Sequence, residues 1–259
     1  MKPSRENDTP VYNVPAVDRA ASIMLMLGTE KREMTLAEIA SATGYHKSSV
    51  HKILITLCRH GFLERNEATK QYSLGIEFVR CGQAALSNLH IHNSAKSLLQ
   101  ELSDYSGETA NLAVLRGTQM VIVDVVESAV ELRVSPPVGT MDSVINKSNG
   151  KAVLAWLPGN TVNAIIKREG LPERTKRSIT NAKQYLKELA AVREQGYATD
   201  FEEFQEGISA VSAPIFDKEG RIFATVSIVG PAFRITKEKM RLYGKKCAEA
   251  AAQLSSMNR

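Results

Sequence analysis

Residues 16–74 constrain the fold of this 259-residue chain most, because three helical patterns and two strand patterns follow one another there with short connections. Apolar residues at helical spacing predict a first helix over 16–28. Thr35 and Glu38 have the spacing of a capping box, which predicts a second, short helix that closes near Gly44. A tight turn then leads directly into the next helix.

A third helix is predicted from about Lys47 to His60, because four apolar residues fall on one face: Val50, Ile53, Leu54 and Leu57. Its opposite face is polar and cationic. Two short strands, 62–65 and 71–74, follow around a polar loop. Helix, helix, short turn, helix and hairpin is the order of a winged helix-turn-helix, in which the third helix enters the major groove of DNA.

Basic side chains gather over 45–72, where five Lys or Arg and three His accompany only two Glu. Lys52 is placed to reach a guanine edge, whereas Arg65 and Lys70 of the wing would contact phosphates. The candidate DNA contacts are Lys47, Ser48, Ser49, His51, Lys52, Thr56, Arg65 and Lys70. Such a stretch also occurs as a solvated surface, and three small helices with a hairpin can form a protein-docking module. The short turn and the basic wing favour DNA.

The composition changes on both sides of this module. Residues 1–13 are polar and contain two prolines, which predicts a flexible arm, so the winged domain spans 14–75. A helix over 75–90 has apolar residues on one side. It is predicted as a linker, 76–90, whose apolar side packs either on a second subunit or on its own domain. A second domain is predicted over 91–257.

The second domain alternates pairs of strands with helices. Strands are predicted at 109–115, 120–127, 131–134, 209–216 and 221–229, and helices at 94–105, 149–157, 160–169, 181–195 and from Thr236 onward. Because hairpin turns rather than βαβ crossovers join the strands, the pattern predicts an α+β domain built on an antiparallel sheet.

Searches for catalytic and metal-binding motifs find none that is complete. Gly150 and Lys151 are similar to the end of a phosphate-binding loop, but Ile145 stands where its first glycine must be. No nucleophile elbow or HExxH motif occurs, and all five histidines lie in 46–92. An acidic cluster is interpreted as a loop face first and a ligand site second: Asp200, Glu202, Glu203 and Glu206. We therefore predict no catalytic activity, no metal and no cofactor.

The formal net charge of +5 permits a nucleic-acid partner without proving one. The three cysteines lie far apart, which is typical of a reducing cytosol. No apolar run approaches the roughly 18 residues of a membrane span. The first ten residues lack the apolar core of a signal peptide. We expect a cytoplasmic protein with no membrane partner.

Small polar residues recur at strand and loop positions of the second domain: Ser148, Asn149, Asp200, Ser209, Ser212 and Ser227. They alternate with apolar residues such as Ile208 and Val211. This composition is typical of a small pocket with a few convergent hydrogen-bonding groups. It is equally typical of a core whose polar groups are satisfied, so both interpretations stay open.

Short motifs extend along nearly the whole chain: Val17-Asp-Arg-Ala, Leu36-Ala-Glu-Ile-Ala, Lys47-Ser-Ser-Val-His-Lys, Leu57-Cys-Arg-His-Gly-Phe-Leu, Tyr72-Ser-Leu-Gly75, Gly107-Glu-Thr-Ala-Asn-Leu-Ala-Val-Leu115, Gly150-Lys-Ala152, Gly196-Tyr-Ala, Ala213-Pro-Ile215 and Gly230-Pro231. In this order and spacing, from about residue 14 to 255, the chain resembles the IclR family of bacterial transcriptional regulators. The resemblance implies a DNA-binding first domain and a GAF-like second domain that binds a small metabolite, commonly an organic or aromatic acid. It also implies a homodimer, in some members paired into a tetramer, on operator DNA.

Carried over position by position, the resemblance implies an effector site of Asn146, Lys147, Ser148, Asn149, Asp200, Ile208, Ala210 and Ser227. The ammonium of Lys147 is expected to pair with a carboxylate of the effector, the alternative being a solvated loop lysine. Where many members have a cysteine this chain has Ala210, so a thiolate metal site is not expected.

Together these inferences predict a sequence-specific DNA-binding regulator, repressor or activator, whose operator binding is modulated by a metabolite in the second domain. One alternative is an enzyme or sensor with a protein-docking N-terminal module, which the basic wing disfavours. The other is a non-specific chromatin-type DNA-binding protein, which the pocket-like composition of the second domain disfavours.

Overall fold

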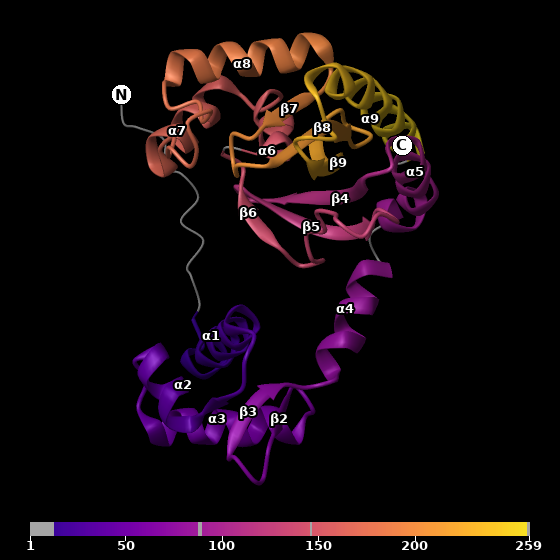
Figure 1. Cartoon of the computed structure of the whole chain (residues 1–259). Helices are drawn as coiled ribbons and strands as arrows, with labels where there is room; N and C mark the ends of the chain where they lie inside the picture. Colours follow the sequence, from indigo (N-terminus) through magenta and orange to yellow (C-terminus); the bar gives the residue numbers. More distant parts are fainter. Residues whose placement is uncertain (1–12, 88–89, 146, 258–259) are drawn as a thin grey trace, which may run out of the picture. The chain divides into compact units, whose positions relative to one another are not determined.

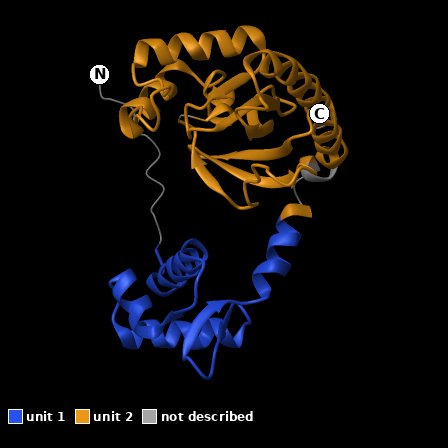
Figure 2. Ribbon diagram, viewed as in Figure 1, with its two compact units in different colours: residues 1–85 blue, residues 86–259 orange. Residues whose placement is uncertain are grey.

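The residues that the computed structural model describes are 13–87, 90–145 and 147–257. The chain divides into two compact units, residues 1–85 and 86–259 (Figure 2). The expected flexible arm, 1–13, lies outside the described residues except for Asn13. Each unit is described by itself below.

The first unit combines helices with a small antiparallel sheet in the order β1-β3-β2 (Figure 1). Its elements are α1 (Pro15–Glu30), β1 (Met34–Thr35), α2 (Leu36–Thr43), α3 (Lys47–Arg59), β2 (Leu63–Arg65), β3 (Gln71–Leu74) and most of α4 (Glu77–Ser87). The predicted capping box is confirmed: Thr35 Oγ1 accepts a hydrogen bond from the Glu38 amide at 3.3 Å, and Glu38 Oε2 accepts one from the Thr35 amide at 2.7 Å.

The apolar faces predicted for the first three helices meet in one core, whose buried members include Ile23, Leu27, Ile39, Val50, Leu54, Leu57, Leu63 and Tyr72. The structure differs from the prediction in two places. Helix α1 continues past Gly28, and Lys31 ends it in the left-handed conformation at φ 52°. Strand β1 was not predicted. It is a strand only because it pairs with β3, with Met34 opposite Tyr72, and its two residues are too few to show an alternation of apolar and polar residues.

The second unit is built on one antiparallel sheet, whose described strands have the order β6-β5-β4-β9-β8-β7 (Figure 1). Its elements are α5 (His90–Ser106), β4 (Thr109–Arg116), β5 (Gln119–Val126), β6 (Met141–Ser143), α6 (Ser148–Leu154), α7 (Gly159–Glu169), α8 (Ala182–Gln195), β7 (Ala198–Phe201), β8 (Ile208–Phe216), β9 (Ile222–Pro231) and α9 (Lys237–Met257). The α+β class, with a helix-turn-helix first and an antiparallel sheet second, is confirmed.

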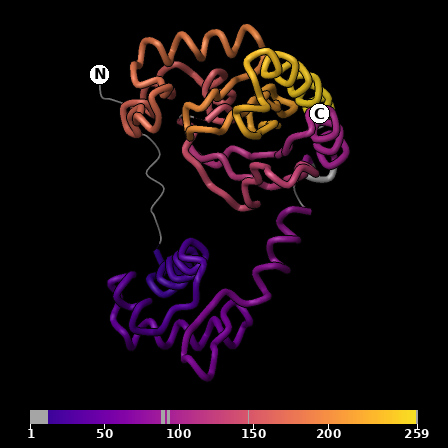
Figure 3. Tube along the Cα trace, in the orientation of Figure 1, coloured from indigo at the N-terminus to yellow at the C-terminus, as the bar shows by residue number. Residues whose placement is uncertain are grey.

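Two apolar clusters hold this sheet. One joins α5 and α9 to the sheet, and the magenta α5 lies beside the yellow α9 (Figure 3). The other joins α6, α7 and α8 to the sheet. The N-cap predicted for the last helix is present, since Thr236 Oγ1 accepts a hydrogen bond from the Lys239 amide at 3.4 Å.

The predicted strand 131–134 is wrong, because residues 127–140 form a loop without a strand. The Glu127 carboxylate closes this loop by accepting hydrogen bonds from Arg133 at 3.0 Å and Ser135 at 2.5 Å. Two adjacent prolines in the loop lack the N–H groups that a strand ladder requires. The edges of the sheet are instead β6 and β7, two short strands that alternation did not predict.

The first and last long strands of the second unit pair in the middle of its sheet, with Thr109 of β4 opposite Val229 of β9. The buried Glu108 carboxylate accepts hydrogen bonds from the Arg234 guanidinium at 2.5 and 2.8 Å. Gly230 passes so close that a Cβ there would lie 2.4 Å from Glu108 Oε2. The Glu108–Arg234 ion pair therefore connects the residue before β4 with the segment between β9 and α9.

Candidate functional site

Helix α3 presents most of the predicted DNA contacts on one face of the first unit. The exposed positions are Lys47, Ser48, His51, Lys52 and Thr56, and Ser49 is half-buried. The opposite face anchors the helix through buried Val50, Leu54 and Leu57. Gly44, at φ 69°, ends α2 in the left-handed conformation and allows the short turn before α3. The sequence thus folds α3 as a supported helix with a polar, cationic outer face.

A residue of α1 that the sequence analysis missed also reaches this surface. Arg19 Nη1 donates a hydrogen bond to Ser49 Oγ at 3.1 Å, and its guanidinium lies over the Tyr45 ring at 5.5 Å from the centroid. The hydroxyl of Thr56 donates to the Lys52 carbonyl at 2.9 Å. Two of the three predicted hydroxyls, those of Ser49 and Thr56, therefore have partners within the unit, and Arg19 adds a cation beside α3.

Both predicted contacts of the wing and two of the six predicted contacts of α3 meet around one hollow of about 280 Å³. It is lined by Thr35, Leu36, Ala37, Lys47, His51, Arg65, Lys70 and Tyr72. Glu67 pairs with Lys70 at 2.9 Å and with Arg65 at 3.4 Å. Exposed pairs of this kind contribute little to stability, so both cations are available to a DNA phosphate.

The second unit contains a cavity of about 190 Å³ at which the structure brings together seven of the eight predicted effector contacts. These are Lys147, Ser148, Asn149, Asp200, Ile208, Ala210 and Ser227. Asn146 lies outside the described residues. The cavity is also lined by Ser212, which the composition of the second domain indicated, and by residues that were not predicted: Asn111, Ile122, Val134, Pro136, Asp142, Phe204, Gln205 and Val229.

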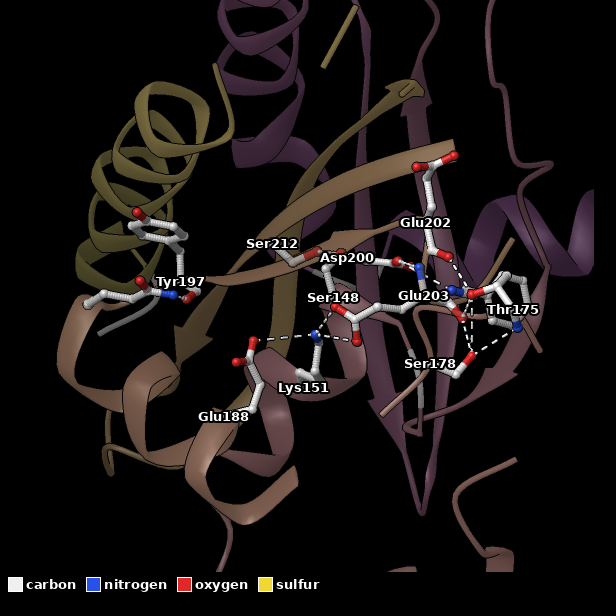
Figure 4. Close-up of polar contacts among 12 residues, drawn as sticks. Ser148, Lys151, Thr175, Ser178, Glu188, Tyr197, Asp200, Glu202, Glu203 and Ser212 are labelled. Carbon is white, nitrogen blue, oxygen red and sulfur yellow. Dashed lines mark hydrogen bonds and ion pairs between the residues drawn. The ribbon is translucent and has the colours of Figure 1, made fainter. Parts of the chain in front are cut away.

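The start of α6 and the central strands supply the hydroxyl groups of this cavity. Ser212 of β8 lies opposite Ser227 of β9 in the sheet, and their Oγ atoms are 2.7 Å apart. Ser148 Oγ lies 2.7 Å from Ser212 Oγ and extends the chain of hydroxyls (Figure 4). The next residue but one, Gly150, lets α6 approach the backbone of Val144. The serines are therefore both internally bonded and part of the cavity wall.

Lys147 has partners within the protein. Its Nζ lies 2.5 Å from Asp142 Oδ2 and 4.0 Å from the centroid of the Phe204 ring. Both side chains of the ion pair are one-quarter exposed. A ligand carboxylate would therefore meet an ammonium that is already paired. Asp142 stands five positions before Lys147 in the sequence, and this spacing is the signal that could have indicated the pair.

Asp200 is the most buried ionisable group of the cavity wall, with 5% of its surface exposed. Its Oδ1 accepts hydrogen bonds from the amides of Glu203 at 2.8 Å and Phe204 at 3.3 Å. Burial raises the pKa of Asp200 to about 6, and the Glu203 carboxylate acts in the same direction. The ammonium of Lys151 opposes this shift.

Lys151, in α6 behind the cavity, has a fully buried side chain. Its Nζ lies 2.7 and 2.9 Å from the two carboxylate oxygens of Glu203 and 3.4 Å from Glu188 of α8 (Figure 4). Thr175 and Ser178 hydroxyls donate to the carbonyls of Glu202 and Glu203 at 2.6 and 2.7 Å. These contacts fix the loop after β7, which carries the cavity residue Phe204.

The interpretation of the acidic cluster as a loop face is wrong for two of its four members. Asp200 is buried, and the Glu203 side chain is only 13% exposed because it faces Lys151. A buried carboxylate is stabilised by a cation or by hydrogen bonds, and the cation that Glu203 meets is Lys151. The alternation of residues did not reveal that the Lys151 side chain is buried. In the described parts of the chain, no group of three or more His, Cys, Asp or Glu is arranged to hold a metal ion. No described helix is long and apolar enough to cross a membrane.

A winged helix-turn-helix with a cationic outer helix, in one chain with a cavity-bearing α+β domain, defines a DNA-binding transcriptional regulator. Comparison with known families agrees: the IclR helix-turn-helix domain matches residues 16–67, and the C-terminal domain of bacterial transcriptional regulator IclR matches residues 83–256. The chain belongs to the IclR family of transcriptional regulators, a family of regulators rather than enzymes.

Relatives of known function cover nearly the whole chain. The regulator KipR of Bacillus subtilis is 31% identical over 90% of this chain and 92% of its own length. The transcriptional repressor IclR of Escherichia coli is 27% identical over 98% of this chain and 93% of its own. An IclR regulator of Alicyclobacillus acidocaldarius has a similar structure, with a TM-score of 0.87 and 29% identity over 96% of this chain and all of that chain.

Proposed function

We propose that the protein is a sequence-specific regulator, repressor or activator, whose operator binding responds to a small organic or aromatic acid in the cavity of the second unit. The cavity carries this proposal, because it combines hydroxyls, an ammonium at Lys147 and apolar walls. Two relatives bear the names of small organic compounds: an acetate operon repressor of Salmonella typhimurium and a glycerol operon regulatory protein of Streptomyces coelicolor. The proposed function needs no metal or cofactor and is exercised in the cytoplasm.

Regulation requires that the acid bind one arrangement of the protein better than another, because a ligand shifts an equilibrium only through its differential affinity. We propose a homodimer, or a tetramer made of two dimers, as the assembly that changes. In support, α4 begins beside Ile76, which is 66% exposed, and carries Val79, which is 58% exposed. Val17 and Leu25 of α1 are also exposed. Sedimentation or light scattering of the full chain tests this assembly.

The function is tested by fluorescence anisotropy of DNA from upstream of its own gene, with scrambled DNA as the control, at several salt concentrations. Tight binding that favours the upstream DNA at physiological salt supports sequence-specific regulation. Organic acids are then screened for those that shift this binding. Equal, salt-sensitive binding to both DNAs in the presence of every acid contradicts the proposal and favours non-specific binding.

Lys52→Ala is expected to weaken binding to the operator by about 1–3 kcal/mol while affecting scrambled DNA much less, because a base contact discriminates between sequences. Lys52 is exposed on α3, so its loss should not disturb folding. Lys70→Gln is the comparison, since a wing cation that contacts phosphate weakens both DNAs alike. Equal losses on both DNAs for the Lys52 variant would reduce Lys52 to a phosphate contact.

Lys147→Met is expected to weaken binding of an effector acid about tenfold or more, because it removes the ammonium that lines the cavity. Isothermal calorimetry with the acid found in the screen measures this loss. Lys167→Met, an exposed lysine of α7, is the matched control. Unchanged affinity in the Lys147 variant would show that Lys147 serves only its internal partner, Asp142.

A further inference from the structure

The charges around the cavity do not favour the binding of an anion that brings no proton or cation with it. Among the described residues that line it, three are ionisable: Asp142, Lys147 and Asp200. The ammonium of Lys147 is balanced by Asp142 at 2.5 Å. Asp200, with 5% of its surface exposed, is left as a net negative charge. A carboxylate ligand would therefore add a second uncompensated negative charge, which is strongly unfavourable in a buried site.

The groups around Asp200 do not supply the missing positive charge. Lys151 of α6 is the nearest buried cation, but its Nζ is engaged by both oxygens of Glu203 and by Glu188 of α8. Glu203, in the loop after β7, is itself a like charge. From the neighbouring strand, the residue opposite Asp200 is the uncharged Ala210. Across the cavity stand the paired Asp142 and Lys147, and Arg174 lies outside the lining with its guanidinium 4.4 Å from the centroid of the Phe204 ring.

The hydrogen bonds of Asp200 leave one of its oxygens available. Oδ1 accepts both backbone amides, from Glu203 and Phe204. Among the described residues, no hydrogen bond to Oδ2 is present. A proton on Oδ2 would thus cost no hydrogen bond among the described residues, and it would turn an oxygen that repels an anion into a hydrogen-bond donor.

We propose that the cavity binds a small monocarboxylate together with one proton, and that Asp200 Oδ2 is the group that takes the proton from solvent and donates it in a hydrogen bond to the ligand carboxylate. The inference rests on the proposed function, that an organic acid binds here. The bound acid and the proton together add no net charge to the site. A proton on Asp200 is accessible near neutral pH, because burial already raises the pKa of this carboxyl to about 6.

The same arrangement defines the class of ligand. A dicarboxylate brings two negative charges, and the site offers one proton and one ammonium that is already paired. The volume of about 190 Å³ limits the size as well. A cavity of about 150 Å³ holds benzene, so this one suits a monocarboxylate of roughly six to ten non-hydrogen atoms. Asp200 is therefore a specificity-determining residue against dicarboxylates.

The test uses isothermal calorimetry of the full chain with the sodium salts of butyrate, lactate, benzoate and phenylacetate, and of succinate as the dicarboxylate. Titrations at one pH in two buffers of different ionisation enthalpy give the number of protons taken up. Near pH 7.5 we expect close to one proton per bound monocarboxylate. Because the proton is linked to binding, Kd should rise by up to tenfold per pH unit between pH 7 and pH 8. Succinate should bind at least tenfold more weakly than butyrate.

Asp200→Asn is the decisive variant, because asparagine resembles the neutral acid and its Oδ1 can still accept both backbone amides. It should bind the monocarboxylate at pH 8 as tightly as the unaltered protein does at pH 6, with no proton uptake and no pH slope. Glu206→Gln is the matched control: it removes an exposed carboxylate of the same loop that does not line the cavity, and it should retain proton uptake.

The outcomes separate the inference from the function on which it rests. Binding of a monocarboxylate without proton uptake, or an unchanged pH slope in Asp200→Asn, overturns the proton-coupled site and leaves the effector function standing. If no acid of the panel binds either protein between pH 5.5 and pH 8, both are overturned.

Discussion

Gly150→Ala should destabilise the second unit by at least about 3 kcal/mol, although alanine favours helices over glycine by about 1 kcal/mol. The cause is a backbone contact. A Cβ at Gly150 would lie 2.0 Å from the carbonyl oxygen of Val144 and 2.4 Å from its carbonyl carbon. A flexible side chain could move away from such a clash, but here helix α6 and the segment before it would have to separate. The cavity would be deformed with them, since Ser148 and Asn149 line it.

Urea unfolding followed by tryptophan fluorescence measures this loss, because the chain has one tryptophan, Trp156, directly after α6 and packed against Phe216. Gly159→Ala is the control: it lies at the start of α7, and no atom lies within 4 Å of its Cβ position. That variant should be as stable as the original or slightly more stable. Equal midpoints for both variants would mean that α6 does not pack as closely as described.

Lys151→Met should cost about 3–5 kcal/mol, because it leaves the Glu203 carboxylate buried without its cation. The double variant Lys151→Met, Glu203→Leu should recover most of this loss, since an apolar pair replaces the ion pair. Lys246→Met removes a lysine at the same 2.7 Å from its partner, Glu249, but that pair is exposed. This control should lose less than about 1 kcal/mol.

The pH dependence distinguishes lost charge from lost packing in the Lys151 variant. Burial raises the pKa of Glu203, and Lys151 opposes that shift. Without the lysine, the folded state disfavours the carboxylate more strongly than the unfolded state does. Stability relative to the original protein should therefore be lowest at high pH and improve as pH falls and Glu203 takes up a proton. An equal loss at pH 5 and pH 8 would attribute the effect to packing of the lysine stem alone.

The winged domain could be predicted almost entirely from sequence, because its determinants are local. The Thr35–Glu38 capping box and the apolar face of α3 specify their helices through residues three or four positions apart. Strand β1 escaped prediction because only its pairing with Tyr72 makes it a strand. The contact between Arg19 and Ser49 likewise joins two helices whose relative placement no local pattern reports.

The cavity was predictable only in part. The recurrence of small polar residues indicated Ser212, and the family resemblance indicated Lys147, whereas neither indicated Asn111 or Phe204. Asn111 reaches the cavity because β4 pairs with β9, a long-range pairing that alternation cannot predict. The burial of Lys151 could not be predicted either, because a Gly-Lys motif in the sequence does not show whether the lysine side chain is exposed or buried.

The central pairing of β4 with β9 also determines the order in which the two units can fold during synthesis of the chain. The winged domain leaves the ribosome first, and the helices and strands that pack in its core all lie within it. The sheet of the second unit, by contrast, cannot close until β9 and Arg234, near the end of the chain, have emerged to meet β4 and Glu108. A nascent or truncated chain would therefore carry a folded DNA-binding module before the cavity that we propose as the metabolite site has formed.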